Sequence, residues 1–95
     1  MSSFAKAFSP ALREIRILCS QSGNASAGTR QFVLAKYPII KKHNPDLPVL
    51  IREAADTPAR VFARFERGVE RHVELDNLSS ADVESKVAQL LSSSS

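Results

Sequence analysis

The chain has 95 residues, enough for one domain with a modest core and too few for a second domain or an elaborate buried substrate pocket. Hydrophobic residues make up 43% of it and charged residues 24%, ordinary values for a globular protein that exclude wholesale disorder. Its formal net charge of +3 is compatible with RNA or with an acidic protein partner, and its single cysteine excludes an intramolecular disulfide.

The first predicted element is a strand over residues 12–19. Ile15, Ile17 and Cys19 fall on alternate positions, which is the period of a strand with one buried face. Residues 1–11 are expected to form a flexible N-terminal segment ahead of the domain.

A helix is predicted from Thr29 to about His43, after a loop rich in serine and glycine. Its apolar residues fall on one helical stripe, made of Phe32, Val33, Tyr37 and Ile40. Ser26 or Thr29 is expected to cap the first turn through a side-chain oxygen. Pro38 lies inside the pattern and should kink the helix or divide it into two pieces.

The run Val49–Ala54 is short and apolar and ends in charge, which indicates a second strand buried on both faces beside the first one. Residues 59–66 and 70–75 alternate in the same way as the first strand, and Gly68 lies in the short turn between them. These two segments therefore predict a β-hairpin.

The last predicted element is a helix that follows Ser79. Ser79 with Asp82 three residues later is a capping-box-like start, and the buried stripe consists of Val83, Val87, Leu90 and Leu91. Residues 92–95 are expected to form a frayed tail. The element order predicts one α/β domain over residues 12–91, thioredoxin-like, in which β-α-β is followed by a β-hairpin and a C-terminal helix around a four-stranded mixed sheet.

Cys19 is the one candidate for redox chemistry. A thioredoxin-like fold places its redox position after the first strand, and Cys19-Ser-Gln-Ser22 has the C-x-x-S pattern of one-thiol glutaredoxins. Against this interpretation, no second cysteine can resolve a mixed disulfide, and Cys19 is in phase with the buried residues of its strand. Pro58 occupies the slot where such folds often hold a cis-proline, and both isomers stay open.

No catalytic, cofactor-binding or metal-binding set is predicted. The histidines at 43 and 72 have no partner cluster in the sequence. Gly23 and Gly28, in the loop between the first strand and the helix, suggest anion binding only weakly, because no lysine–serine pair accompanies them. No continuous apolar run approaches the length of a membrane-spanning helix.

Basic residues concentrate on the hairpin and on the strand before it, at Arg52, Arg60, Arg64, Arg67 and Arg71. Near Phe62 and Phe65, such arginines could bind RNA through phosphate contacts and base stacking. They could equally pair with acidic groups of a protein partner. Glutamates at 53, 66, 70 and 74 make the strip mixed in sign, which favours a protein over a nucleic acid.

Four segments together resemble the small thioredoxin-fold accessory subunits of mitochondrial respiratory complex I, a family shared with some mitochondrial ribosomal proteins. They are Leu12-Arg-Glu-Ile-Arg-Ile17, Asn44-Pro-Asp-Leu-Pro-Val-Leu-Ile-Arg-Glu53, Ala63-Arg-Phe65 with Gly68, and Leu78-Ser-Ser-Ala-Asp-Val83. The resemblance covers nearly the whole chain and is closer to the complex I branch than to the ribosomal branch. Ala54 and Ala55 stand where some relatives have a second thiol.

The resemblance implies a nuclear-encoded subunit on the matrix side of the mitochondrial inner membrane, peripheral to it and without a flavin, iron–sulfur cluster or quinone of its own. It implies other complex I subunits as partners, above all the large iron–sulfur subunit of the peripheral arm, and a role in assembly and stability. We expect the docking surface to include Arg52, Glu53, Arg60, Arg64 and Arg67. A mitochondrial ribosomal protein of the same fold and a one-thiol redox protein acting through Cys19 are the alternatives.

Overall fold

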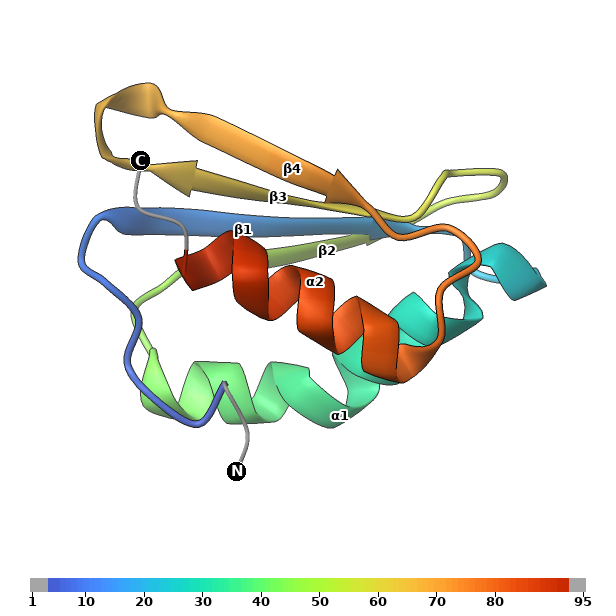
Figure 1. Ribbon diagram of the computed structural model, residues 1–95, viewed down its shortest axis with the longest axis horizontal. Helices are drawn as coiled ribbons and strands as arrows, with labels where there is room; N and C mark the ends of the chain where they lie inside the picture. The colour runs from blue at the N-terminus through green and yellow to red at the C-terminus, as the bar shows by residue number, and fades with distance from the viewer. Residues whose placement is uncertain (1–3, 93–95) are drawn as a thin grey trace.

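The computed structural model describes residues 4–92 as two layers, a mixed sheet and a layer of helices (Figure 1). The chain runs through β1 (Leu12–Cys19), α1 (Ala27–His43), β2 (Val49–Glu53), β3 (Arg60–Phe65), β4 (Glu70–Glu74) and α2 (Ser80–Ser92), with short 3-10 turns at Asn24–Ser26 and Glu66–Gly68. The sheet has four strands in the order β2-β1-β3-β4, and β1 is parallel to β2 and antiparallel to β3. The predicted fold class is confirmed, and this order is compatible with a thioredoxin-like arrangement.

The core lies between the sheet and the helices, which both cover the same face (Figure 1). Its sheet side contains the predicted alternating residues Ile15, Ile17, Cys19, Val61, Ala63 and Phe65. Its helix side contains Phe32 and Ile40 of α1 and the predicted stripe of α2, Val83, Val87, Leu90 and Leu91. Burial of these apolar side chains is the main force that holds the two layers together.

A β-bulge interrupts β1 near its start. Leu12 pairs with Phe65 of β3, but the next paired residue, Glu14, lies opposite Arg64, so Arg13 is an extra residue in the strand. The bulge shifts the alternation by one residue. Leu12 and Ile15 therefore both face the core, and Glu14 faces the opposite side of the sheet.

The N-terminal segment contributes to the core as well. Phe4 is 0% exposed and packs edge-to-face against Phe32 of α1, with ring centroids 5.3 Å apart. The hydrophobic core therefore begins at Phe4, ahead of the domain start predicted at Leu12. Flexibility of residues 1–11 stays a prediction, and the expected frayed tail lies, apart from Ser92, outside the described residues.

The prediction that β2 is buried on both faces is wrong. β2 is an edge strand, and of its five residues only Val49 is buried. Leu50 and Ile51 are exposed although their side chains are aliphatic. An apolar run indicates a strand, but strand order decides whether the strand is central, and strand order is a property of the whole fold.

The helix α1 is continuous through Pro38, so the predicted division into two pieces does not occur. It begins two residues before Thr29, which is buried inside the helix and caps nothing. Ser26 occupies the N-cap position, but its hydroxyl accepts a hydrogen bond from the Ser20 N–H at 2.9 Å instead of one from the first turn. The Ser26 oxygen is therefore used by the loop and does not cap the first turn of α1.

The other local predictions concern turns and caps. The Ser79 hydroxyl accepts a hydrogen bond from the Asp82 N–H at 3.2 Å, which confirms Ser79 as the cap of α2. β3 and β4 form the predicted hairpin, with Arg67 and Gly68 in left-handed conformations at φ 65° and 74°. The peptide bond before Pro58 is trans.

Candidate functional site

The second face of the sheet carries none of the described elements, because both α1 and α2 lie on the first (Figure 1). We call this second surface the open face. Strand alternation and the pairing register place on it the side chains of Glu14, Arg16, Leu18, Leu50, Arg52, Arg60, Phe62, Arg64, Glu70, His72 and Glu74. A face of this kind offers charged and aromatic groups on a rigid frame, which suits recognition of another macromolecule.

The centre of the open face is a row of three stacked side chains. Phe62 pairs across the sheet with Arg16 on one side and with His72 on the other. The guanidinium carbon of Arg16 lies 5.0 Å from the Phe62 ring centroid, and the His72 ring stacks on Phe62 at 5.2 Å with an interplanar angle of 30°. These cation–π and stacking contacts hold the row together and present a flat, partly apolar surface.

The hairpin end of the open face is an ion-pair network around Glu14. Its Oε1 accepts from Arg64 Nη2 at 3.0 Å, and its Oε2 lies 3.3 Å from Arg16 Nε. Arg16 also pairs with Glu70 of β4. The Glu14 side chain is only 18% exposed, so its carboxylate depends on these arginines for compensation.

At the other end of the open face, Leu18 lies between Arg52 and Arg60 in the pairing register. Arg52 forms no ion pair with any residue of the described chain. The Nε atom of Arg60 is buried and has no hydrogen-bond partner among residues 4–92. Since buried donors are nearly always paired in proteins, this end of the face has unused capacity for an acidic partner.

The structure brings together three of the five predicted interface residues. Arg52, Arg60 and Arg64 share the open face. Glu53 lies opposite Cys19 and therefore points to the helix side of the sheet. Arg67 lies in the hairpin turn, at the far end of the sheet from Glu53 (Figure 1).

The aromatic residues considered for RNA stacking separate in the same way. Phe62 is on the open face, whereas Phe65 is buried in the core at 1% exposure and cannot stack on a base. Arg64 and Arg16 are already paired with glutamates. The open face is therefore mixed in sign, as the sequence predicted, and it is a better match to a protein than to a phosphate backbone.

Cys19 is in an environment that opposes thiolate chemistry. Its side chain is 1% exposed. Burial raises the pKa of the Cys19 thiol above its ordinary value, the nearby charge of Glu53 raises it further, and the charge of Arg30 lowers it only in part. A reactive thiol needs a lowered pKa and access to its substrate, so Cys19 acts as a packing residue of the core.

The loop between β1 and α1 does not form an anion site with its two glycines. Gly28 belongs to α1, where a Cβ atom would lie 2.0 Å from the Leu78 carbonyl oxygen, so its role is close packing against the chain before α2. Arg30 closes the loop by donating to the carbonyl oxygens of Ser20 and Gly23, each at 3.1 Å. Within residues 4–92, no three metal-binding side chains gather, and no helix is long and apolar enough to cross a membrane.

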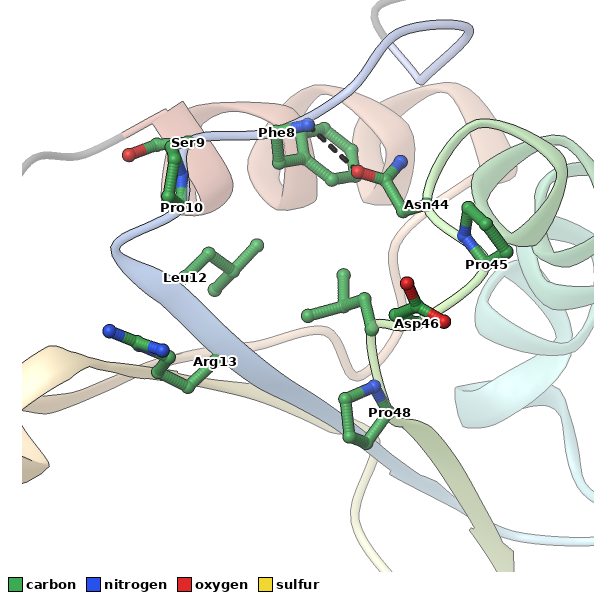
Figure 2. A pocket seen from close by; sticks show the side chains of 10 residues that line it. Phe8, Ser9, Pro10, Leu12, Arg13, Asn44, Pro45, Asp46 and Pro48 are labelled. Carbon is green, nitrogen blue, oxygen red and sulfur yellow. Dashed lines mark hydrogen bonds between the residues drawn. The ribbon is translucent and has the colours of Figure 1, made fainter.

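A pocket of about 340 Å³ lies between the N-terminal segment, the start of β1 and the loop after α1 (Figure 2). Asn44 joins its two walls. Its Oδ1 accepts from the Phe8 N–H at 2.8 Å, and its Nδ2 donates to the Lys6 carbonyl oxygen at 2.9 Å. Asn44 thus fastens the N-terminal segment to the body of the domain, which is a structural role.

Sequence reasoning missed Glu14 and Arg16 as members of the site, because both belong to a strand interpreted mainly through its buried residues. One signal was available. Leu12 and Ile15 are three residues apart in a strand, which breaks the period of two and indicates a bulge between them.

Comparison with known proteins places these features in context. The profile of the mitochondrial ribosomal protein L51 / S25 / CI-B8 domain matches residues 29–80, which include most of α1, all of β2 and the hairpin. The matched part contains Arg52, Arg60 and Arg64, whereas Glu14 and Arg16 lie outside it.

Three curated proteins are similar over most of the chain. The NADH-ubiquinone oxidoreductase 10.5 kDa subunit of Neurospora crassa is 45% identical over 94% of this chain and 95% of its own length. NADH dehydrogenase (ubiquinone) 1 alpha subcomplex subunit 2 of Arabidopsis thaliana is 42% identical over 90% of this chain and 88% of its own length. The protein of the same name in Mus musculus is 40% identical over 85% of this chain and 82% of its own length.

Proposed function

The chain belongs to the mitochondrial ribosomal protein L51 / S25 / CI-B8 domain family, and from this premise we propose that it is an accessory subunit of mitochondrial NADH:ubiquinone oxidoreductase (complex I). The observation that carries the proposal is that the three relatives at 40–45% identity are all named as subunits of this enzyme and match at nearly full length. The family name alone covers ribosomal proteins too, so the near-full-length relatives decide between the branches.

The proposed role is support of assembly and stability, without catalysis by this chain. The expected position is on the peripheral arm of the complex, on the matrix side of the inner membrane, with the large iron–sulfur subunit as the main partner. The chemistry of the described residues agrees with a non-catalytic role, because the one nucleophilic thiol, Cys19, is buried and its pKa is raised. Electrons would be carried by cofactors of other subunits.

We propose the open face as the docking surface, with Arg52, Arg60 and Arg64 as its basic contacts. Arg60 and Arg52 have donors that no described carboxylate uses, and Phe62 supplies apolar area between charged groups. Energetically important interface residues are often aromatic residues and arginines, and arginine can form bidentate pairs with carboxylates. Glu53 and Arg67 lie at two margins of this surface.

Native-gel migration of the tagged chain tests the function. Mitochondria are solubilised gently, the complexes are separated, and the band that contains the chain is identified by NADH dehydrogenase activity and mass spectrometry. Co-migration with iron–sulfur subunits of complex I is the expected result. Migration with ribosomal subunits would replace the proposal by the ribosomal alternative, and a free small species would reopen the redox alternative.

A pair of charge reversals tests the docking surface. Arg64 and Arg71 are both on the hairpin, but Arg71 pairs with Ala63 and so lies on the other side of the sheet. Arg64→Glu should reduce incorporation into the complex about tenfold, the effect of one lost interface ion pair with the new repulsion. Arg71→Glu is the matched control and should leave incorporation within about twofold of wild type. Equal incorporation of both variants would refute the open face as the docking surface.

A further inference from the structure

One edge of the sheet has backbone groups that the described chain leaves unpaired. The Ile15 N–H donates to the Pro48 carbonyl oxygen at 3.0 Å, and the Ala54 N–H donates to the Cys19 carbonyl oxygen at 3.2 Å. In the parallel ladder between these two bonds, every second residue of β2 faces β1, namely Leu50 and Arg52. The N–H and C=O groups of Val49, Ile51 and Glu53 therefore point outward from the edge.

Nothing in the described chain covers this edge. β2 pairs only with β1 in the strand order, and none of the turn and loop hydrogen bonds of residues 4–92 uses the outward groups of Val49, Ile51 or Glu53. The strand also exposes two aliphatic side chains, Leu50 at 53% and Ile51 at 38%, before the charged residues Arg52 and Glu53. An edge strand with free backbone groups and exposed aliphatic side chains is a template for a further strand.

The opposite edge of the sheet is built differently. The hydrogen bonds from Phe65 N–H to the Val69 oxygen and from Leu75 N–H to the Ala59 oxygen set the antiparallel ladder, so Glu70, His72 and Glu74 present the outward groups of β4. All three side chains are polar or charged and disfavour pairing with another strand. The β2 edge differs by its exposed aliphatic residues Leu50 and Ile51, which favour pairing with a further strand.

We propose that β2 accepts an extended segment of a partner protein by strand addition, through the outward backbone groups of Val49, Ile51 and Glu53. Side chains select the segment. A residue opposite Leu50 would contact an aliphatic side chain on the open face, and a residue opposite Ile51 would contact one on the helix side. A residue opposite Arg52 would face a guanidinium that has no ion-pair partner in the described chain. The segment therefore carries two apolar residues followed or preceded by an acidic one.

The occupant is a different protein and not a second copy of this chain. Two copies pairing antiparallel about Ile51 would set Arg52 of each opposite Leu50 of the other, and neither guanidinium would meet a carboxylate. A segment of a different protein can supply that carboxylate, and we assign this segment to another subunit of the complex. The inference in this respect rests on the proposed function.

Amide hydrogen exchange of the full-length chain tests the proposal directly. In the free chain, the amides of Val49, Ile51 and Glu53 should exchange within seconds, because their N–H groups face solvent. In the intact complex purified through the tagged chain, the same three amides should exchange at least about 100-fold more slowly, because they form ladder hydrogen bonds with the added strand. Unchanged exchange in a chain that does co-purify with the complex would overturn strand addition and leave the proposed function standing.

A proline variant provides a second measurement, with a milder change at the same position as the matched control. Ile51→Pro removes one outward N–H and no bond to β1, whereas Ile51→Val keeps this N–H and an aliphatic side chain. We expect Ile51→Pro to reduce incorporation about tenfold and Ile51→Val to change it less than about twofold, at a temperature where both free chains are folded.

Each outcome has a separate meaning. Equal incorporation of both variants refutes strand addition at β2. Protection of the β2 amides that grows with concentration in the isolated wild-type chain assigns the edge to a second copy and overturns the choice of partner. Absence of the wild-type chain from complex I overturns the proposed function itself.

Discussion

The helix-covered face and the open face of the sheet come from alternate residues of the same strands. On β3, Val61 and Ala63 are completely buried against the helices, whereas Phe62 and Arg64 are on the open face. The covered face is held by packing of apolar volumes. The open face is held by ion pairs and by the Arg16–Phe62–His72 stack.

Because the two faces are held by different interactions, we expect one face to determine the stability of the fold and the other to determine assembly. Packing in a filled core is sensitive to the size of each side chain, so changes on the covered face should alter the free energy of unfolding. Exposed ion pairs contribute little to folding, so changes on the open face away from the mostly buried Glu14 should alter assembly with little effect on stability. Four experiments, from the largest expected effect to the smallest, test whether the two faces divide their roles in this way.

The strongest contrast is expected between Phe4→Ala and Phe62→Ala. Phe4 is completely buried against Phe32, so its removal leaves a cavity and should lower the free energy of unfolding by about 4 kcal/mol. Phe62→Ala removes a ring from the open face and should cost only about 1 kcal/mol. Urea unfolding measures both, and native gels should show reduced incorporation for Phe62→Ala even at a temperature where it is fully folded.

The second experiment concerns the packing of α1 against the chain before α2. A Cβ atom on residue 28 would lie 2.0 Å from the Leu78 oxygen, so Gly28→Ala should lower the free energy of unfolding by about 3 kcal/mol. Ala35→Gly, at an exposed position of the same helix, calibrates the intrinsic helix preference, which favours alanine by about 1 kcal/mol. A stabilising Gly28→Ala would show that this contact is loose.

The third experiment uses pH to probe Cys19 at the covered face. Its pKa is raised in the folded chain, mainly by burial, so the folded state holds the thiol proton more tightly than the unfolded state does. The contribution of Cys19 to stability is intact below the ordinary thiol pKa and is lost as the pH rises above it. Thermal unfolding should therefore show that wild type loses more stability above about pH 8.5 than Cys19→Ala does. Parallel pH profiles of the two chains would contradict burial as the cause.

The smallest effect is expected at the hairpin turn, where Arg67 has a φ of 65°. Asparagine tolerates this left-handed conformation better than arginine, so Arg67→Asn should raise the free energy of unfolding by about 0.5 kcal/mol. Incorporation should fall about threefold if the guanidinium contacts the partner at the margin of the open face. The free energy of unfolding would then rise while incorporation falls. If both rise in Arg67→Asn, Arg67 is not part of the interface.

The sequence predicted the secondary structure well wherever the pattern is local. Alternation in β1 and β3, the Ser79 cap and the stripe of α2 all follow from neighbouring residues, and each is confirmed. Predictions were wrong where a distant segment decides the outcome. β2 is apolar yet exposed because it lies at the edge, and the Ser26 hydroxyl is taken by the Ser20 amide.

The same limit explains which parts of the candidate site were predictable. The arginines at 52, 60 and 64 stand out by charge and were named from sequence. Glu14, the acidic partner of Arg64, was not, because it reaches the open face only through the bulge at Arg13 and meets Arg64 from 50 positions away in the chain. Contacts of this kind depend on the register between strands, which no local pattern specifies.

The central place of β1 affects how the chain reaches its native state. β1 is the first strand to leave the ribosome, yet its two neighbours, β2 and β3, come after α1 and after the next loop. Until both arrive, its apolar row from Ile15 to Cys19 has no strand beside it and is open to wrong pairings. Long-range pairing of this kind slows folding and lengthens the time during which aggregation competes. The risk of aggregation is therefore greater for the unfinished chain than for the folded domain.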